Sequence, residues 1–359
     1  MSYFLFVIAL LMIFINSKSN SHKEEVFSSI DGIVIKGFFS IIIIIHHIGQ
    51  KIDVFSFNYS NELIGSFAVG VFFMISAYGM LKSCKKKDYN YIKELILRKI
   101  PKLYAIQVVV NLIYYFIFYN SGLTQEMILR IFNLHLLFGL NPLNGYSWFI
   151  TTIICIYVIF ALTLIIAKLF KLSNKELFLC ITMIIFTGLL YCYVKYLAKN
   201  ISIPKLYIRA IVCYALGVIV YLFENWVISI PKKQNIILII ITFIAAFLCF
   251  VTKIVSSYMI HTQIMPALLC IMLVLICKNF SFENNKIGIF LGKISLFTYL
   301  LQKIVFNLIP IQFGGIFYGF IIIALTIIVA TIATLLLRGI EKIIKKIKQL
   351  FNKKPDEIT

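Results

Sequence analysis

The chain has 359 residues, of which 61% are hydrophobic and 13% charged, with a mean hydropathy of +0.98. Soluble domains are roughly half apolar and a quarter charged, so this composition excludes a soluble enzyme, a disordered chain and a fibrous protein. The apolar residues form continuous runs of about 17–23 residues, the length that a helix needs to cross a bilayer. Because only helices and closed barrels span membranes, the sequence predicts an all-α, polytopic integral membrane protein.

The net charge of +20, from 34 Lys and Arg against 14 Asp and Glu, has an ordinary explanation in such a protein. Cytoplasmic loops carry an excess of Lys and Arg, so we expect membrane lipids around the chain and no nucleic acid partner. The eight cysteines lie mostly inside apolar runs and form no CxxC pair. We interpret them as small core residues and predict neither disulfides nor a metal site.

Eleven apolar segments are predicted to cross the membrane: one N-terminal helix and about ten core helices. In chain order they are 3–16, 33–51, 63–81, 103–119, 147–167, 176–194, 206–223, 234–252, 260–277, 287–309 and 316–338. A shorter apolar piece, 129–140, is predicted to be re-entrant or interfacial. The first segment has no positive n-region and no small-residue cleavage site, so we expect it to be retained. We divide the chain into an N-terminal helix with a cytoplasmic connector (1–30), a membrane domain (31–338) and a basic cytoplasmic tail (339–359).

Lysine-rich segments give the expected orientation. Segment 82–102 carries eight basic residues and the chain from Arg338 onward carries seven, so both are predicted to be cytoplasmic. Lysines also follow the first helix, which would place the N-terminus outside. Segment 339–351 spaces its apolar and basic residues like an amphipathic helix, and we expect it to lie on the anionic inner leaflet.

Ionisable residues inside segment 33–51 are the first candidates for chemistry. Lys36 lies near its inner end, and His46 and His47 nearer its outer end. Such groups cost about 2.5–3.5 kcal/mol inside a span on insertion scales, although Lys36 can snorkel to the surface. At roughly 100° per residue, Lys36 and His47 share one helix face about 16 Å apart, whereas His46 points roughly 80° away. We predict His47 as a catalytic base and His46 in packing or orientation; a structural role for His47, and His46 as the base, stay open.

Later segments add polar and aromatic candidates. Arg209 closes a predicted outer loop with three lysines, where positive charge runs against topology; it is either solvated or faces an anionic or lipid-pyrophosphate acceptor. Trp148, at the outer entrance of its helix, suits the interfacial aromatic belt or stacking on a sugar ring. Ser295 and Tyr299 lie one helical turn apart and serve either packing or hydrogen bonding across helices.

A series of short motifs resembles the membrane-bound acyltransferase 3 family, which includes polysaccharide O-acetyltransferases. The matching stretches, in family order, are Lys36-Gly37 with His47, FAVGVFFMISAYGM (67–80, containing Ser76), KELILRKIPKLY (93–104), SWFITTIICIYVIF (147–160), 209–217 and LGKISLFTYLLQ (291–302). The chain departs from the family pattern at Lys36, Ala77 and Gln302, where Arg, Gly and His are usual. The resemblance covers about residues 30–340 and leaves segment 3–16 outside the family's ten-helix pattern.

The resemblance implies an O-acyltransferase in a bacterial plasma membrane. It would move an acyl group, acetyl by default, from cytoplasmic acetyl-CoA to a hydroxyl of a cell-surface or lipid-linked saccharide, with no permanently bound cofactor. Acyl transfer needs a base on the alcohol and donors for the developing oxyanion, and histidine suits the base at neutral pH. Arg98 is expected to bind acyl-CoA phosphates, Lys36 to contact the donor as a point charge, and Ser76 to contact substrate.

Two other functions stay open. A transporter or flippase of lipid-linked sugars would explain the many helices and the outer basic loop, but it predicts internal repeats that we do not find. A catalytically inactive membrane partner would explain the departures at Lys36, Ala77 and Gln302.

Overall fold

The computed structural model describes residues 2–19, 23–51, 58–119, 122–134, 140–146, 148–192, 208–251, 260–309 and 315–351. These residues are almost entirely helical, and two-residue strands β1 (Lys18–Ser19) and β2 (Phe280–Ser281) pair antiparallel. The helices are α1 (Ser2–Ile13), α2 (Ser29–Lys51), α3 (Asn58–Lys87), α4 (Asn90–Glu94), the π-helical turn η1 (Leu95–Lys99), α5 (Ile100–Phe118), α6 (Gln125–Ile131), α7 (Trp148–Leu169), α8 (Lys175–Cys192), α9 (Val212–Leu222), α10 (Glu224–Ser229), α11 (Lys232–Val251), the π-helical turn η7 (Ile260–Ile264), α12 (Met265–Cys277), α13 (Lys286–Leu308) and α14 (Gly315–Phe351).

The predicted fold class, an all-α polytopic membrane protein, is confirmed. Within the described ranges, eight helical runs are long and apolar enough to cross a membrane, and two shorter apolar helices, Val212–Leu222 and Thr262–Cys277, accompany them. Together with α1 they pair one to one with the eleven predicted segments. Helix α9 begins at Val212 instead of 206, after Ala210 adopts a left-handed backbone conformation with φ 56°.

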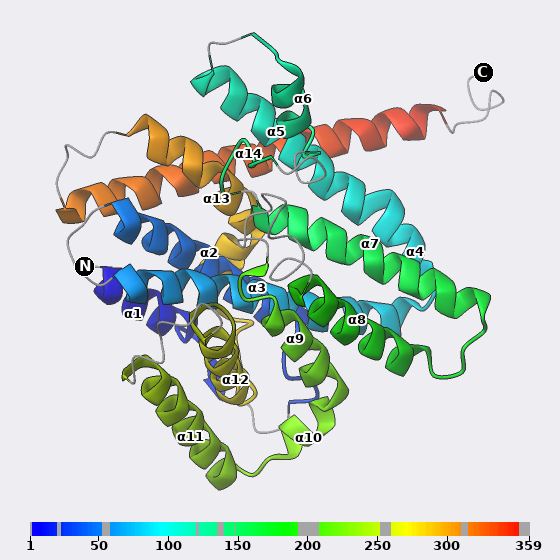
Figure 1. Cartoon of the computed structure of the whole chain (residues 1–359), viewed down its shortest axis with the longest axis vertical. Coiled ribbons are helices and arrows are strands. Elements are labelled where there is room, and N and C mark those ends of the chain that lie inside the picture. Colours follow the sequence, from blue (N-terminus) through cyan, green and yellow to red (C-terminus); the bar gives the residue numbers. More distant parts are fainter. Residues whose placement is uncertain are drawn as a thin grey trace.

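Helices α2 and α3 are the most buried of the candidate spans, and α2 packs between α3 and α13 (Figure 1). Its run of five isoleucines, 41–45, is buried among these neighbours. Glycines bring α2 and α13 into backbone contact, because a Cβ on Gly37 would lie 2.5 Å from the nitrogen of Gly292, and a Cβ on Gly292 would lie 2.2 Å from the carbonyl oxygen of Ile33. Only glycine permits so close an approach. The two helices therefore form a tight pair at the N-terminal half of α2.

The outer helices expose apolar side chains, as lipid-facing helices do. Phe116 of α5, Ile185 of α8, Phe243 of α11 and Leu336 of α14 are each more than half exposed. Apolar surface of this extent is costly in water and is the normal surface of a helix in hydrocarbon.

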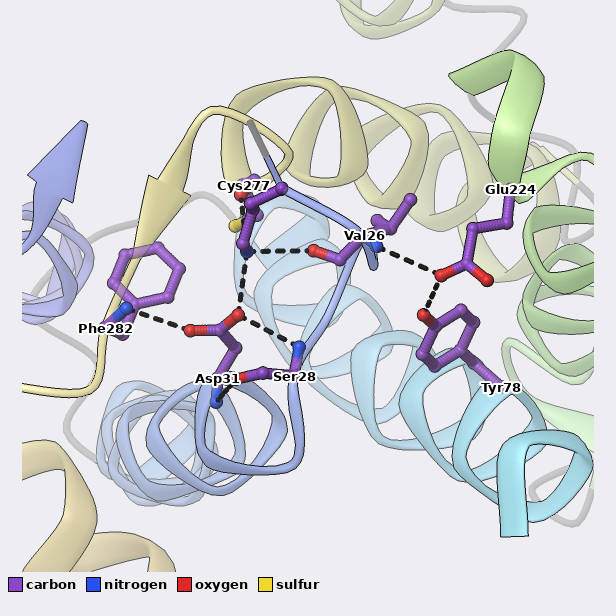
Figure 2. A network of polar contacts seen from close by, with 8 residues as sticks. Val26, Ser28, Asp31, Tyr78, Glu224, Cys277 and Phe282 are labelled. Carbon is purple, nitrogen blue, oxygen red and sulfur yellow. Dashed lines mark hydrogen bonds and ion pairs between the residues drawn. The ribbon is translucent and has the colours of Figure 1, made fainter. Parts of the chain in front are cut away.

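A buried ion pair fixes the start of α2 (Figure 2). Asp31 is fully buried and accepts from Lys23 Nζ at 2.7 Å, from the Ser28 N–H at 3.0 Å and from the Phe282 N–H at 2.8 Å. Lys23 Nζ also donates to the carbonyl of Cys277 at the end of α12. The carboxylate thus accepts three hydrogen bonds, and Lys23 Nζ donates three with the carbonyl of Val26 included, as a buried ion pair requires.

Glu224 continues this network toward α3 (Figure 2). Its carboxylate accepts from the Val26 N–H at 3.1 Å and from the Tyr78 hydroxyl, and it pairs with Lys82 at 2.8 Å. The connector before α2 is therefore tied to α3, to α12 and to the segment after α9. No sequence pattern predicts these contacts.

Segment 82–102, which the sequence analysis treated as a loop, is mostly helical. Helix α3 continues to Lys87, the chain turns at Asp88 with φ 52°, and α4, η1 and α5 then form one run from Asn90 to Phe118. The lysines, glutamate and leucines here are good helix formers, and Glu94 pairs with Lys87 at 2.5 Å. An extra residue in the π-helical turn η1 changes which side chains face the bundle.

Two other predicted pieces differ from the structure. Segment 339–351 is helical but is not a separate element, because α14 runs unbroken through Gly339 to Phe351; a single glycine costs about 1 kcal/mol and does not end a helix. Glu341 of this extension pairs with Lys102 of α5 at 2.8 Å. The predicted re-entrant piece 129–140 includes the end of α6 and the turn 132–134, while 135–139 lies outside the described residues.

Candidate functional site

A cavity of about 190 Å³ lies at the end of α2 that carries the two histidines. Its walls come from α2, α3, α13, the start of α7, the loop 140–146 and the turn before α9. The lining residues are Ile43, His46, His47, Gln50, Gly65, Val69, Gly145, Tyr146, Trp148, Arg209 and Tyr299. Five of the nine predicted site residues are thus brought to one place: His46, His47, Trp148, Arg209 and Tyr299.

His47 is held in the cavity wall by aromatic rings. Its imidazole stacks on the ring of Tyr146 with centroids 3.7 Å apart and planes 10° apart, and it meets the edge of Phe306 at 6.3 Å. Stacking on one face and an edge contact on another restrict the rotation of the ring. The side chain therefore has a defined orientation before any substrate binds.

A hydrogen bond to Gln50 fixes the tautomer of His47. The Nδ1 atom lies 2.9 Å from Oε1 of Gln50, one helical turn later on the same face of α2. Because an amide oxygen only accepts, Nδ1 carries the hydrogen and Nε2 of the neutral ring is the acceptor. A neutral imidazole with Nε2 able to take a proton is the form that a general base requires.

His46 has a different environment. It is 4% exposed and lies against α3 at Gly65, where an added Cβ would be 2.5 Å from its Nε2. Its ring centroid is 4.8 Å from that of His47. Any displacement of His46 is therefore transmitted to its neighbour.

The loop 140–146 positions Tyr146. The Asn144 side chain donates to the carbonyl of Leu300 on α13 at 3.0 Å and accepts from the Tyr146 N–H at 3.1 Å. These bonds anchor the loop to α13 beside the cavity. Burial raises the pKa of Tyr146 above its ordinary value, so its phenol stays protonated at neutral pH and can donate a hydrogen bond.

Trp148 and Tyr299 complete the aromatic wall. Trp148 is the first residue of α7 and is 6% exposed, and Tyr299 of α13 is 4% exposed. Both rings make edge contacts with Phe149, at 6.2 Å and 5.6 Å between centroids. The indole N–H and the phenol add neutral donors to the lining.

The charge of this site is positive. Arg209 lines the cavity, and Lys303 of α13 places Nζ 4.9 Å from the centroid of Tyr146. Both side chains act electrostatically on His47, and the lining contains no aspartate or glutamate. Across the described ranges, no group of three or more His, Cys, Asp or Glu side chains is arranged to hold a metal ion.

A second polar cluster lies toward the other end of α2. Lys36 is half-buried and is close enough to Lys99 of η1 for the two charges to repel. Lys99 donates to the hydroxyl of Tyr91 at 2.9 Å and pairs with Glu94 at 3.4 Å. Ser76 faces the hydroxyl of Tyr157 in the same region. These predicted residues therefore do not line the cavity.

The remaining two predicted residues, Arg98 and Ser295, do not line the cavity either. Arg98 is exposed, because the π-helical turn directs its neighbour Lys99 toward the bundle. Ser295 donates to the carbonyl of Gly292 in its own helix at 2.9 Å, a contact that serves the helix itself.

Sequence reasoning missed four residues of the site. Gln50 follows His47 by three residues, so helical spacing could have identified it. Lys303 is a lysine inside an apolar span, which is itself a signal of function. Gly65 and Tyr146 give no such signal, because their importance arises from contacts with α2 that only the fold creates.

Comparison with known proteins gives one family. A family model described as an acyltransferase domain matches residues 27–337, most of the chain. Comparison with curated proteins and with solved structures gave no match.

Proposed function

Because the chain belongs to the acyltransferase 3 family, we propose that this membrane acyltransferase moves an acyl group, acetyl by default, from cytoplasmic acetyl-CoA to a hydroxyl of a cell-surface or lipid-linked saccharide. The membrane is the bacterial plasma membrane, and the cavity opens toward its outer side. The observation that carries the proposal is the geometry of His47, which lines the cavity with Nδ1 bound to Gln50 and Nε2 left as the proton acceptor.

The proposed reaction needs no group beyond the two substrates. Nε2 of His47 takes the proton of the acceptor hydroxyl while the hydroxyl oxygen attacks the thioester carbonyl. A carbon–oxygen ester bond forms, the carbon–sulfur bond breaks, and the imidazolium returns its proton to the departing CoA thiolate. Trp148 and Tyr299 line the cavity with neutral donors suited to the oxyanion of the tetrahedral intermediate.

The donor is proposed to reach His47 from the opposite end of α2. Lys36 and Lys99 bring two positive charges together there, and the exposed Arg98 directly precedes Lys99 in η1. The phosphates of acetyl-CoA match such a group of cations. Lys36 and His47 share a face of α2, so the acyl end of the donor would extend along this face toward the cavity.

The test is acyl transfer by the purified protein in lipid nanodiscs. Labelled acetyl-CoA is supplied with saccharide acceptors, and label on the glycan is measured. General-base catalysis contributes about 10²–10⁴-fold, so His47→Ala should lose that factor at normal expression. His46→Ala should lose less, and Gln50→Leu should lower kcat, since the bond that fixes the tautomer is removed. Lys293→Gln, an exposed site on α13, is the control.

Two results would contradict the assignment. If His47→Ala keeps activity and His46→Ala is inactive, His46 is the base. If the wild-type protein transfers no label from any acyl-CoA to any glycan tested, while it binds the donor, the chain is an inactive member of its family.

A further inference from the structure

Arg209 brings a permanent positive charge to the cavity, and no described residue forms an ion pair with it. Its Nε is buried and has no hydrogen bond to any residue that the structure describes. A buried charged donor left unsatisfied is costly. An anionic ligand that accepts hydrogen bonds from the guanidinium would offset this cost.

Lys303 adds a second charge beside Tyr146, a residue of the cavity lining. Its Nζ lies over the ring of Tyr146, which also stacks on the imidazole of His47. No ion pair within the described part of the chain involves Lys303. The nearby Lys51 differs, because its ammonium donates to the carbonyl of Phe306 at 2.8 Å.

Three acidic residues of the described part of the chain form ion pairs elsewhere. Asp31, Glu224 and Glu94 pair with lysines that do not line the cavity, and no carboxylate is among the lining residues. The excess positive charge therefore belongs to the cavity itself. At the end proposed to face outward, it also has no explanation in the positive-inside rule.

We propose that the acceptor is an acidic saccharide, whose phosphate or carboxylate binds between Arg209 and Lys303 while the hydroxyl to be acylated lies at His47. This inference rests on the proposed function and specifies its acceptor. The anionic group is either a substituent of the sugar or the pyrophosphate that links a sugar to a polyprenyl lipid. The rings of Tyr146 and Trp148 would flank the sugar, as aromatic side chains do at saccharide sites.

Binding can be measured independently of catalysis. The chain has two tryptophans, and Trp226 is exposed on α10, so in a Trp226→Phe background the fluorescence of Trp148 reports on the cavity. Two acidic probes, glucose 1-phosphate and glucuronic acid, are compared with the neutral methyl glucoside. Polyprenyl-pyrophosphate glucose is the lipid-linked probe. Acidic probes should bind at least about tenfold more tightly than methyl glucoside, since hydrogen bonds between charged groups are the strong ones.

The variants separate this proposal from its alternatives. Arg209→Gln and Lys303→Gln should remove the preference for acidic probes and leave binding of methyl glucoside unchanged, while Lys293→Gln should behave as wild type. Tighter binding of the lipid-linked probe than of glucose 1-phosphate would identify the linker as the source of the anion.

Equal binding of acidic and neutral probes, or an unchanged preference in both variants, would refute the proposal. So would a loss of coenzyme A binding in Arg209→Gln, which would assign the cation to the donor. A protein that binds acidic sugars but transfers no acetyl would refute only the proposed reaction.

Discussion

Replacing Gly65 with alanine should disturb the catalytic end of α2 through His46. The added Cβ would lie 2.5–2.7 Å from three atoms of the His46 ring, well inside van der Waals contact. The ring is buried between α2 and α3, so it must rotate, or the helices must separate. Overpacking of this kind costs about 1–3 kcal/mol, and the helical gain of about 0.5–1 kcal/mol from Gly to Ala offsets part of it.

The assay is thermal unfolding in detergent, combined with acyl transfer. Gly65→Ala should unfold at a lower temperature and lose activity, because the displaced His46 presses on His47 at 4.8 Å. Gly79→Ala is the matched control on the same helix, since a Cβ there meets no atom within 4 Å, and it should be neutral or stabilising. In a His46→Ala background, Gly65→Ala should resemble the control. An equal loss of stability in both backgrounds would show that the clash with His46 is not the cause.

Two further predictions concern other parts of the chain. Asp31→Ala leaves the ammonium of Lys23 buried and should cost about 3–5 kcal/mol, whereas Glu341→Ala removes an exposed pair with Lys102 and should cost no more than about 1 kcal/mol; similar unfolding temperatures for the two variants would contradict this ranking. At the donor end, Lys99→Gln and Arg98→Gln should each raise KM for acetyl-CoA more than KM for the acceptor, and an unchanged KM for acetyl-CoA in both would remove this segment from the donor site.

Hydropathy was enough to predict the membrane fold, because each crossing helix needs a long apolar run regardless of its neighbours. It was not enough to predict where helices continue through charged sequence. Segment 82–102 is polar and therefore resembles a loop, yet it forms helix because its residues favour that conformation and pair with one another. The unbroken α14 could have been predicted, since no proline separates its apolar and basic parts.

The site was predictable where chemistry and spacing coincide. His47 was predicted as a site residue because an ionisable group inside a membrane span is energetically costly and therefore usually functional. Its spacing from Lys36 placed both residues on one helix face. The choice of Arg98 over Lys99 shows the limit of that reasoning. In η1 an extra residue per turn breaks the regular helical period, so the side chain that meets Tyr91 and Glu94 is Lys99. Contacts between distant segments, such as Tyr146 on His47, leave no local pattern at all.

The glycine contacts between α2 and α13 make the separation of Lys36 and His47 a fixed length. The backbones approach closely at Gly37 and Gly292, and close packing of this kind resists sliding of α2 along its partner. Eleven residues of helix span about 16 Å. Under the proposed function, this distance sets how far the donor must reach from its phosphate-binding end to His47. A donor anchored by its phosphates at one end reaches His47 only if its arm matches that length. Truncated thioesters that lack the nucleotide would carry the same reactive group, but they would have no phosphates with which to position it at His47.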